Sequence, residues 1–179
     1  MLIIERMDHT LRKLKTQSAN MLTIGNMTFG GASLMATLNE AYSFSVLFIF
    51  IAAFFDRFDG VVARKLNQES DLGKQLDSMS DIISFGVAPA ILLYELVLTE
   101  FGIAGMAFTV LYIASGAFRL ARFNISESNG FFIGLPITAA GTVITLSFFG
   151  LAAFPPVLYM FLFLLCSILM VSTFTLKKV

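Results

Sequence analysis

Four aspartates, arranged as two pairs, are the residues of this sequence best suited to do chemistry. Asp56 and Asp59 are three positions apart, and Asp77 and Asp81 are four positions apart. Both spacings place the two carboxylates of a pair on one face of a helix. Each pair lies at one end of an apolar segment, and a short connection joins the two segments. We therefore expect the four carboxylates to converge in one small volume.

Four converging carboxylates repel one another unless cations lie between them. Hard divalent cations such as Mg²⁺ and Mn²⁺ prefer oxygen ligands, and two-metal sites hold two such ions roughly 3.5–4 Å apart. The sequence thus predicts a site for two divalent cations, with the ligands Asp56, Asp59, Asp77 and Asp81. The alternative is a set of helix-end acids that pair with nearby cations, namely Arg57, Arg64, Lys65 and Lys74. The regular spacing favours the metal site.

Small residues accompany the acids at helical spacing. Gly60 and Ala63 follow Asp56 by one and two turns, and Gly73 precedes Asp77 by one turn. Such residues allow a bulky ligand to approach the backbone, but they serve helix packing equally well. Arg64 adds a guanidinium group that suits phosphate oxygens.

The segments that position these residues are apolar helices. The chain is 57% hydrophobic and 13% charged, a balance that excludes intrinsic disorder and a basic nucleic-acid-binding protein. A single cysteine excludes a disulfide framework and a cysteine zinc site. Long runs without charge, of about 18 residues or more, are typical of transmembrane helices. We predict an all-α, polytopic membrane protein with six transmembrane helices, at about 20–38, 43–65, 77–98, 102–123, 131–150 and 155–176.

The basic residues predict the orientation of these helices. With six spans, all 12 Lys and Arg residues fall on one side of the membrane, which the positive-inside rule identifies as cytoplasmic. Both termini and the acid cluster are then cytoplasmic, in a protein integral to the plasma membrane. Residues 1–18 are predicted to form a short interfacial helix, or equally a mobile tail, ahead of a transmembrane domain at 19–179.

The acids and small residues together resemble a known family. The pattern Asp56-x2-Asp59-Gly60-x2-Ala63-Arg64-x8-Gly73-x3-Asp77-x3-Asp81 matches every fixed position of the CDP-alcohol phosphotransferase signature. The resemblance implies transfer of a phosphate-linked group from a CDP-alcohol to an acceptor alcohol, with release of CMP. It further implies that the four acids hold the two cations, that Gly60, Ala63 and Gly73 make room for the cytidine, and that Arg64 supports the phosphates. Asp81 would be the general base, and the protein would be a homodimer.

Other segments resemble the membrane-embedded phosphatidylserine synthases within that family. They are Thr23-Ile-Gly-Asn26, the stretch from Asp81 to Ala90, Arg119-Leu-Ala-Arg122-Phe-Asn124 and Gly134-Leu-Pro136. This similarity implies CDP-diacylglycerol and L-serine as substrates. Arg119 and Arg122 share a helical face and could bind the serine carboxylate, hold phosphates or only anchor the helix at the membrane surface. The remaining candidates for substrate binding are Asn20, Thr23, Ser78 and Asn124.

Three other functions are alternatives to this one. Glycerol 3-phosphate or an inositol phosphate as the acceptor would call for a larger basic pocket. An ion-coupled transporter would place its acids near the bilayer midplane and would contain repeated broken helices. A catalytically inactive scaffold would not need an intact set of four acids. Membrane lipids are expected partners, and nucleic acids are not.

Overall fold

The computed structural model describes residues 2–66, 71–125 and 131–177, with side chains described for 20–61, 72–125 and 134–174. The chain forms the helices α1 (Leu2–Leu38), α2 (Tyr42–Leu66), α3 (Asp71–Asp81), η1 (Ile82–Val87), α4 (Ala88–Leu96), η2 (Leu98–Phe101), α5 (Ile103–Ile125), α6 (Ile137–Ser147), η3 (Phe148–Gly150) and α7 (Pro156–Val171). Two short strands, β1 (Phe131–Ile133) and β2 (Thr175–Lys177), pair antiparallel, with Phe131 opposite Lys177.

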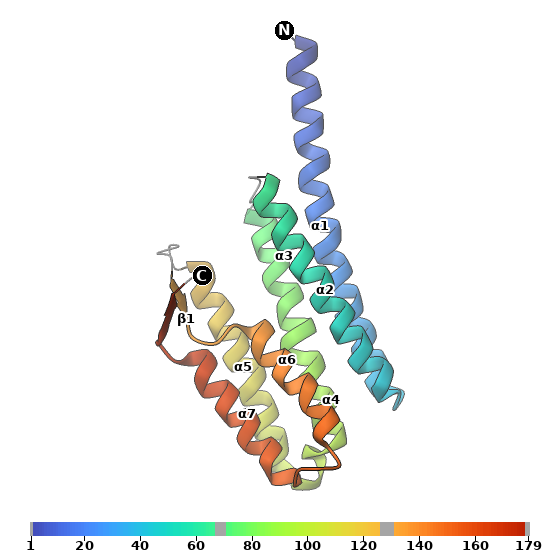
Figure 1. Cartoon of the computed structure of the whole chain (residues 1–179), viewed down its shortest axis with the longest axis vertical. Helices are drawn as coiled ribbons and strands as arrows, with labels where there is room; N and C mark the ends of the chain where they lie inside the picture. The colour runs from blue at the N-terminus through green and yellow to red at the C-terminus, as the bar shows by residue number, and fades with distance from the viewer. Residues whose placement is uncertain (1, 67–70, 126–130, 178–179) are drawn as a thin grey trace.

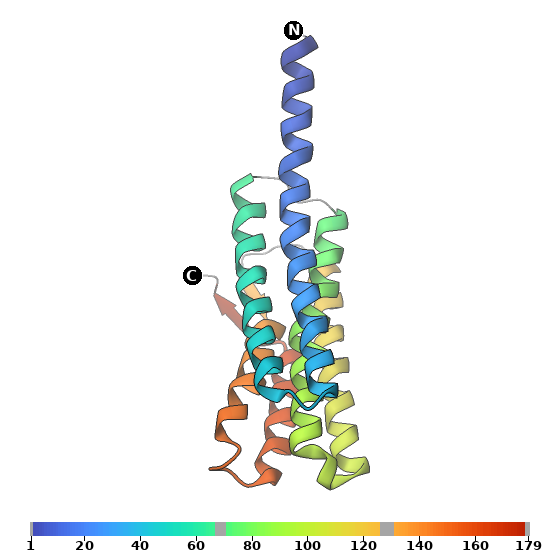
Figure 2. The same cartoon turned by 90° about the vertical axis from the view of Figure 1, so that its right-hand side faces the viewer.

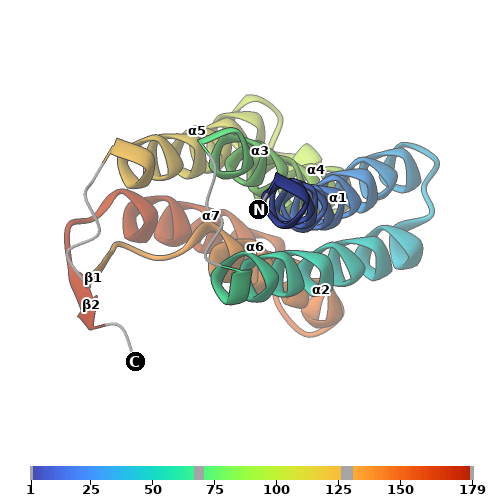
Figure 3. The ribbon, with the colours of Figure 1, turned by 90° about the horizontal axis from the view of Figure 1, so that it is seen from above.

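The long helices form two rows. Seen from above, α5, α3 with α4, and α1 make one row, while α7, α6 and α2 make the other (Figure 3). Facing members of the rows pack together, as α1 does with α2, α4 with α6, and α5 with α7. The N-terminal part of α1 projects beyond the rest of the molecule (Figures 1 and 2). The helical class predicted from the sequence is confirmed.

The helices overlie all six predicted spans, and two of them meet the length and composition expected of a membrane-crossing helix. These are Leu72–Leu96, which joins α3, η1 and α4, and Ile103–Ile125, which is α5. The apolar stretches Ile137–Gly150 and Pro156–Val171 are shorter. The number of spans that cross the membrane therefore stays a prediction.

The N-terminal segment differs from the expectation of a separate short helix. α1 runs without interruption from Leu2 to Leu38, so the part of 1–18 that the structure describes is an extension of the first predicted span. The association of this extension with the membrane surface stays a prediction.

The fifth and sixth predicted spans are shorter than expected where they meet the β1–β2 ribbon. α6 begins at Ile137 rather than at 131, because Gly134 has a φ of 71° and Pro136 precedes the helix. The Gly134 amide donates to the Phe174 carbonyl oxygen at 3.0 Å, and the Leu135 amide donates to the Leu169 carbonyl oxygen at 3.0 Å. α7 correspondingly ends at Val171 rather than at 176.

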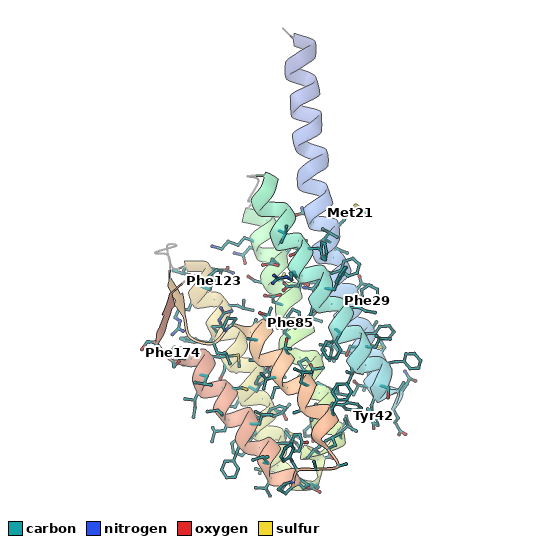
Figure 4. The ribbon with its side chains drawn as sticks, in the orientation of Figure 1. Met21, Phe29, Tyr42, Phe85, Phe123 and Phe174 are labelled. Atoms are coloured by element: carbon teal, nitrogen blue, oxygen red, sulfur yellow. The ribbon has the colours of Figure 1, made fainter. Side chains whose placement is uncertain are left out.

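The apolar core lies where η1, α5, α6 and α7 meet. Phe85, Tyr112, Ile137 and Phe163 are fully buried there, and Phe85 lies in the middle of the molecule (Figure 4). Large apolar side chains also cover the outside, including Met21, Phe44, Phe54, Ile103, Phe149 and Phe161. An apolar exterior of this kind suits contact with lipid, where helix association depends on close packing and internal hydrogen bonds.

Small and hydroxyl residues pack α1 tightly within the subunit. A Cβ atom added to Gly25 would lie 2.7 Å from the Phe55 ring, and one added to Gly30 would meet Ser84. Further along the helix, the hydroxyl of Ser45 lies 2.7 Å from that of Ser33 and 2.8 Å from that of Thr37. Gly25 and Gly30 thus serve packing inside the subunit.

Candidate active site

The predicted acids converge between α2 and α3. One carboxylate oxygen from each of Asp56, Asp59 and Asp77 lies within 4.8 Å of the others. Asp81 joins them through a side-chain hydrogen bond with Asp56. α1 packs against both α2 and α3 and so holds the two acid-bearing helices next to each other. Helical periodicity places each pair on one face, and this packing turns the two faces toward each other.

Three contacts from α1 fix the cluster. The Thr23 side chain forms a hydrogen bond with Asp59, and the Thr23 carbonyl accepts a hydrogen bond of 3.2 Å from Ser80 Oγ. Ser84 Oγ donates to the Asn26 carbonyl oxygen at 3.1 Å. Thr23 therefore contacts an acid of the cluster directly, and its predicted contact with substrate stays a prediction. Asn20, one turn before Thr23, is half-buried.

Several buried polar atoms around the acids have no hydrogen-bond partner among the described residues. They are Asp59 Oδ2, Asp81 Oδ1, Arg119 Nε and both polar side-chain atoms of Asn26. Buried polar groups in proteins are normally paired, so this concentration indicates a place where a ligand supplies the partners. The unpaired carboxylate oxygens and the close approach of three acids fit a hard divalent cation.

A π-helix follows the last acid directly. η1 begins at Ile82, and its Phe85 carbonyl oxygen accepts a hydrogen bond of 2.9 Å from the Tyr112 hydroxyl. A Cβ atom on Gly141 would lie 2.5 Å from the same oxygen, so only glycine allows α6 to approach η1 this closely. π-helices are rare and occur frequently at functional sites. Sequence reasoning missed this element and predicted an uninterrupted span.

Arg119, on α5, approaches the cluster from the other side. Its side chain is 93% buried, close enough to Asp81 to interact electrostatically, and its guanidinium carbon lies 5.7 Å from the centre of the Phe123 ring. Two other predicted residues, Ser78 on α3 and Asn124 on α5, hydrogen-bond to each other. Lys74 Nζ donates to the Asn124 carbonyl oxygen at 3.1 Å.

Arg122 points to a different partner. Its Nη1 donates to the Val171 carbonyl oxygen at 2.9 Å, and its Nη2 donates to the Ser172 carbonyl oxygen at 3.0 Å. These carbonyls belong to the C-terminal end of α7, where cations stabilise the unpaired carbonyl groups of a helix. The two arginines share one helix but serve different neighbours, so the role of Arg122 in substrate binding stays a prediction.

The predicted nucleotide-binding residues lie at the ends of α2 and α3. Gly60 and Gly73 are half-buried next to the acids. Ala63 and Arg64 lie in the last turn of α2, where their side chains fall outside the described residues.

Comparison with known proteins identifies the family to which the chain is similar. The family model for CDP-alcohol phosphatidyltransferase matches residues 16–176. The chain is similar to the CDP-diacylglycerol–serine O-phosphatidyltransferase of Bacillus subtilis (strain 168), at 43% identity over 130 residues, which cover 72% of this chain and 73% of the relative. It is 40% identical to a protein of the same name from Methanocaldococcus jannaschii, over 75% of this chain and 61% of that relative. The archaetidylserine synthase of Methanothermobacter thermautotrophicus is 33% identical over 89% of this chain and 69% of its own length.

Proposed function

Because the chain belongs to the CDP-alcohol phosphatidyltransferase family, we propose that it transfers the phosphatidyl group of CDP-diacylglycerol to the hydroxyl of L-serine. The products are phosphatidylserine and CMP. The observation that carries this proposal is the convergence of three carboxylates within 4.8 Å, next to Asp81 and the buried Arg119. The names of the similar bacterial and archaeal proteins support serine as the acceptor.

Asp56, Asp59, Asp77 and Asp81 are the residues that would hold two divalent cations, Mg²⁺ or Mn²⁺. Bound cations would neutralise the negative charge that develops on the pyrophosphate as CMP leaves. Thr23 supports this arrangement because its hydrogen bond fixes the Asp59 carboxylate.

The donor occupies the end of the cluster formed by α2 and α3. Gly60, Ala63 and Gly73 leave room for the cytidine, Arg64 contacts the phosphates, and Asn20 contributes its amide. The acyl chains lie against the apolar exterior of the helices. This arrangement lets the lipid stay in the membrane while its head group reaches the acids.

The acceptor enters between α3 and α5. Arg119 binds the serine carboxylate, and the Ser78–Asn124 pair shapes this side of the pocket. Asp81 takes the proton from the serine hydroxyl as general base. The serine oxygen bonds to the phosphorus that carries the diacylglycerol, the bond from that phosphorus to the CMP oxygen breaks, and the proton passes from Asp81 to water.

Arg122 contributes to the acceptor side of the site by holding the end of α7 against α5. The names of the similar proteins favour serine over glycerol 3-phosphate or an inositol phosphate as the acceptor. Each of those acceptors carries a phosphate and would call for a larger basic pocket than serine does.

We place the protein in the plasma membrane with six spans and with both termini and the active site on the cytoplasmic side. The supporting observations are the apolar exterior, the two long apolar helices and the positions of the basic residues. By family resemblance, the active form is a homodimer with one site in each subunit.

An acceptor panel tests the proposed reaction. Purified protein receives CDP-diacylglycerol, Mn²⁺ and one alcohol at a time, namely L-serine, glycerol 3-phosphate or inositol phosphate, and CMP release is measured. We expect release with serine alone. CMP release with a phosphorylated alcohol in place of serine would show that the acceptor is a different one. No CMP release with any of the alcohols would overturn the proposed reaction.

A further inference from the structure

Asn26 is a fully buried amide without a hydrogen-bond partner for its side chain among the described residues. Its exposed fraction is 0%, and neither Oδ1 nor Nδ2 is paired. Burying an amide without partners is unfavourable, and native structures usually avoid it. The position is compatible with a stable fold if a bound ligand completes the hydrogen bonds.

The neighbours of Asn26 place it at the acid cluster. Thr23, one turn earlier on the buried face of α1, contacts Asp59. The Asn26 carbonyl accepts a hydrogen bond from Ser84, which follows Asp81 by three positions, and Gly30, one turn later, also packs against Ser84. Asn26 thus lies on α1 between the level of the α2 acids and the beginning of η1.

Two of the unpaired side-chain atoms form a complementary set. Asn26 Oδ1 is an acceptor, and Arg119 Nε–H is a donor. The zwitterionic head of an amino acid requires an acceptor for its ammonium and donors for its carboxylate. The four aspartates are assigned to cations, and Asn26 Oδ1 is a buried neutral acceptor without a partner among the described residues, which suits the ammonium. A fifth carboxylate here would compete for the same cations, which explains why an amide suits the position.

We propose that Asn26 determines specificity for the acceptor, with Oδ1 accepting a hydrogen bond from the α-ammonium of the amino acid while Arg119 binds its carboxylate. This inference rests on the proposed function, which it extends by assigning a residue that discriminates amino acids from other alcohols.

Asn26→Ala tests the inference, with Thr28→Ala as the matched control. Thr28 is exposed on the same helix and donates only to the Ile24 carbonyl within α1. The readouts are the KM values for L-serine and CDP-diacylglycerol and the inhibition constants of L-alanine and propanoate. Both inhibitors carry the carboxylate and lack the hydroxyl, but only L-alanine has the ammonium.

In the wild type, L-alanine should inhibit more strongly than propanoate. Asn26→Ala should weaken L-alanine inhibition and raise the serine KM by on the order of tenfold, which corresponds to one charge-assisted hydrogen bond. Propanoate inhibition and the KM for CDP-diacylglycerol should change less than twofold, and Thr28→Ala should match the wild type.

Equal inhibition by the two compounds in the wild type would overturn the inference without any variant. It would also be overturned if Asn26→Ala weakened both inhibitors equally, because Asn26 would then act through the metal site or through packing. If Asn26→Ala does not fold, Asn26→Leu provides the same comparison, because leucine is similar in size to asparagine and has no hydrogen-bond acceptor. If the wild type releases no CMP with serine, the proposed function itself is refuted. If it releases CMP with serine but Asn26→Ala leaves the ratio of the L-alanine and propanoate inhibition constants unchanged, only the inference about Asn26 is refuted.

Discussion

Ser78 on α3 and Asn124 on α5 hydrogen-bond to each other, with Asn124 Nδ2 donating to Ser78 Oγ at 2.9 Å. Ser78 Oγ also lies 3.3 Å from Asn124 Oδ1. The pair joins two helices at the end where Asp77 and Arg119 lie. Two residues that the sequence suggested as separate ligand contacts are therefore one unit, which holds the arginine-bearing helix beside the acids.

Ser78→Ala removes this link. We expect a loss of about 0.5–1.5 kcal/mol in the free energy of unfolding, because a partly buried amide loses its partner. The serine KM should rise more than the KM for CDP-diacylglycerol, since the link positions the acceptor side of the site. Thermal unfolding and steady-state kinetics measure both effects. Ser43→Ala, at an exposed position of α2, is the control, and equal behaviour of the two variants would refute the link.

Asp81→Asn should abolish turnover while the protein still binds nucleotide and metal. Loss of a general base typically lowers the rate by about 10²–10⁴-fold. An equilibrium titration with CDP-diacylglycerol shows whether the variant still binds its donor substrate. Retained binding indicates loss of the base alone, and lost binding indicates disruption of the whole site. Glu100→Gln, at an exposed acid in η2, should leave the rate unchanged. Near-normal activity of Asp81→Asn would show that another group removes the proton.

Asp56→Asn and Asp77→Asn should lose activity and metal dependence together, because each removes a charged ligand from a cluster of three acids. In the wild type, a chelator should abolish CMP release, and added Mn²⁺ or Mg²⁺ should restore it. The measurements are the rate of CMP release and the amount of bound Mn²⁺, each as a function of Mn²⁺ concentration. Unaltered Mn²⁺ dependence in both variants would place the metal elsewhere.

The two arginines of α5 should respond differently to substitution. Arg119→Ala should raise the serine KM by tenfold or more and change the KM for CDP-diacylglycerol only slightly. The reason is that the variant removes the buried guanidinium group that binds the serine carboxylate. Arg122→Lys should mainly lower the melting temperature, since a lysine cannot reproduce the forked contacts to the Val171 and Ser172 carbonyls. Kinetics and thermal unfolding on the same preparations distinguish the variants. Unchanged serine kinetics in Arg119→Ala would exclude it from the acceptor pocket.

Gly141→Ala should disturb the π-helix that follows Asp81. The added Cβ atom would lie 2.5 Å from the Phe85 carbonyl oxygen, so α6 and η1 must move apart, at a cost of about 1–3 kcal/mol. Gly31→Ala is a matched control in a helix, because its Cβ atom would meet nothing within 4 Å. The melting temperature and the turnover rate should both be lower in Gly141→Ala and unchanged in Gly31→Ala. Equal stability of the two variants would show that η1 tolerates the displacement.

Local spacing predicted a large part of the site. The intervals between Asp56 and Asp59 and between Asp77 and Asp81 match the helical repeat, so each pair shares a face whatever the rest of the chain does. The charge-free runs located the apolar helices for the same reason, since composition alone makes a segment prefer lipid or a packed interior. Both expectations agree with the helices observed.

Tertiary packing decided what local spacing leaves open. The burial of Asn26, the attachment of Arg122 to α7 and the turn at Gly134 each depend on residues far away in the chain. The π-helix at Ile82–Val87 is held by Tyr112 on α5, and Gly141 on α6 lets that helix approach it closely. By itself, the sequence determined the acid pairs and the helical class, because these follow from periodicity and composition. Only the fold decided which faces meet, because that depends on the shapes of all the helices packed together.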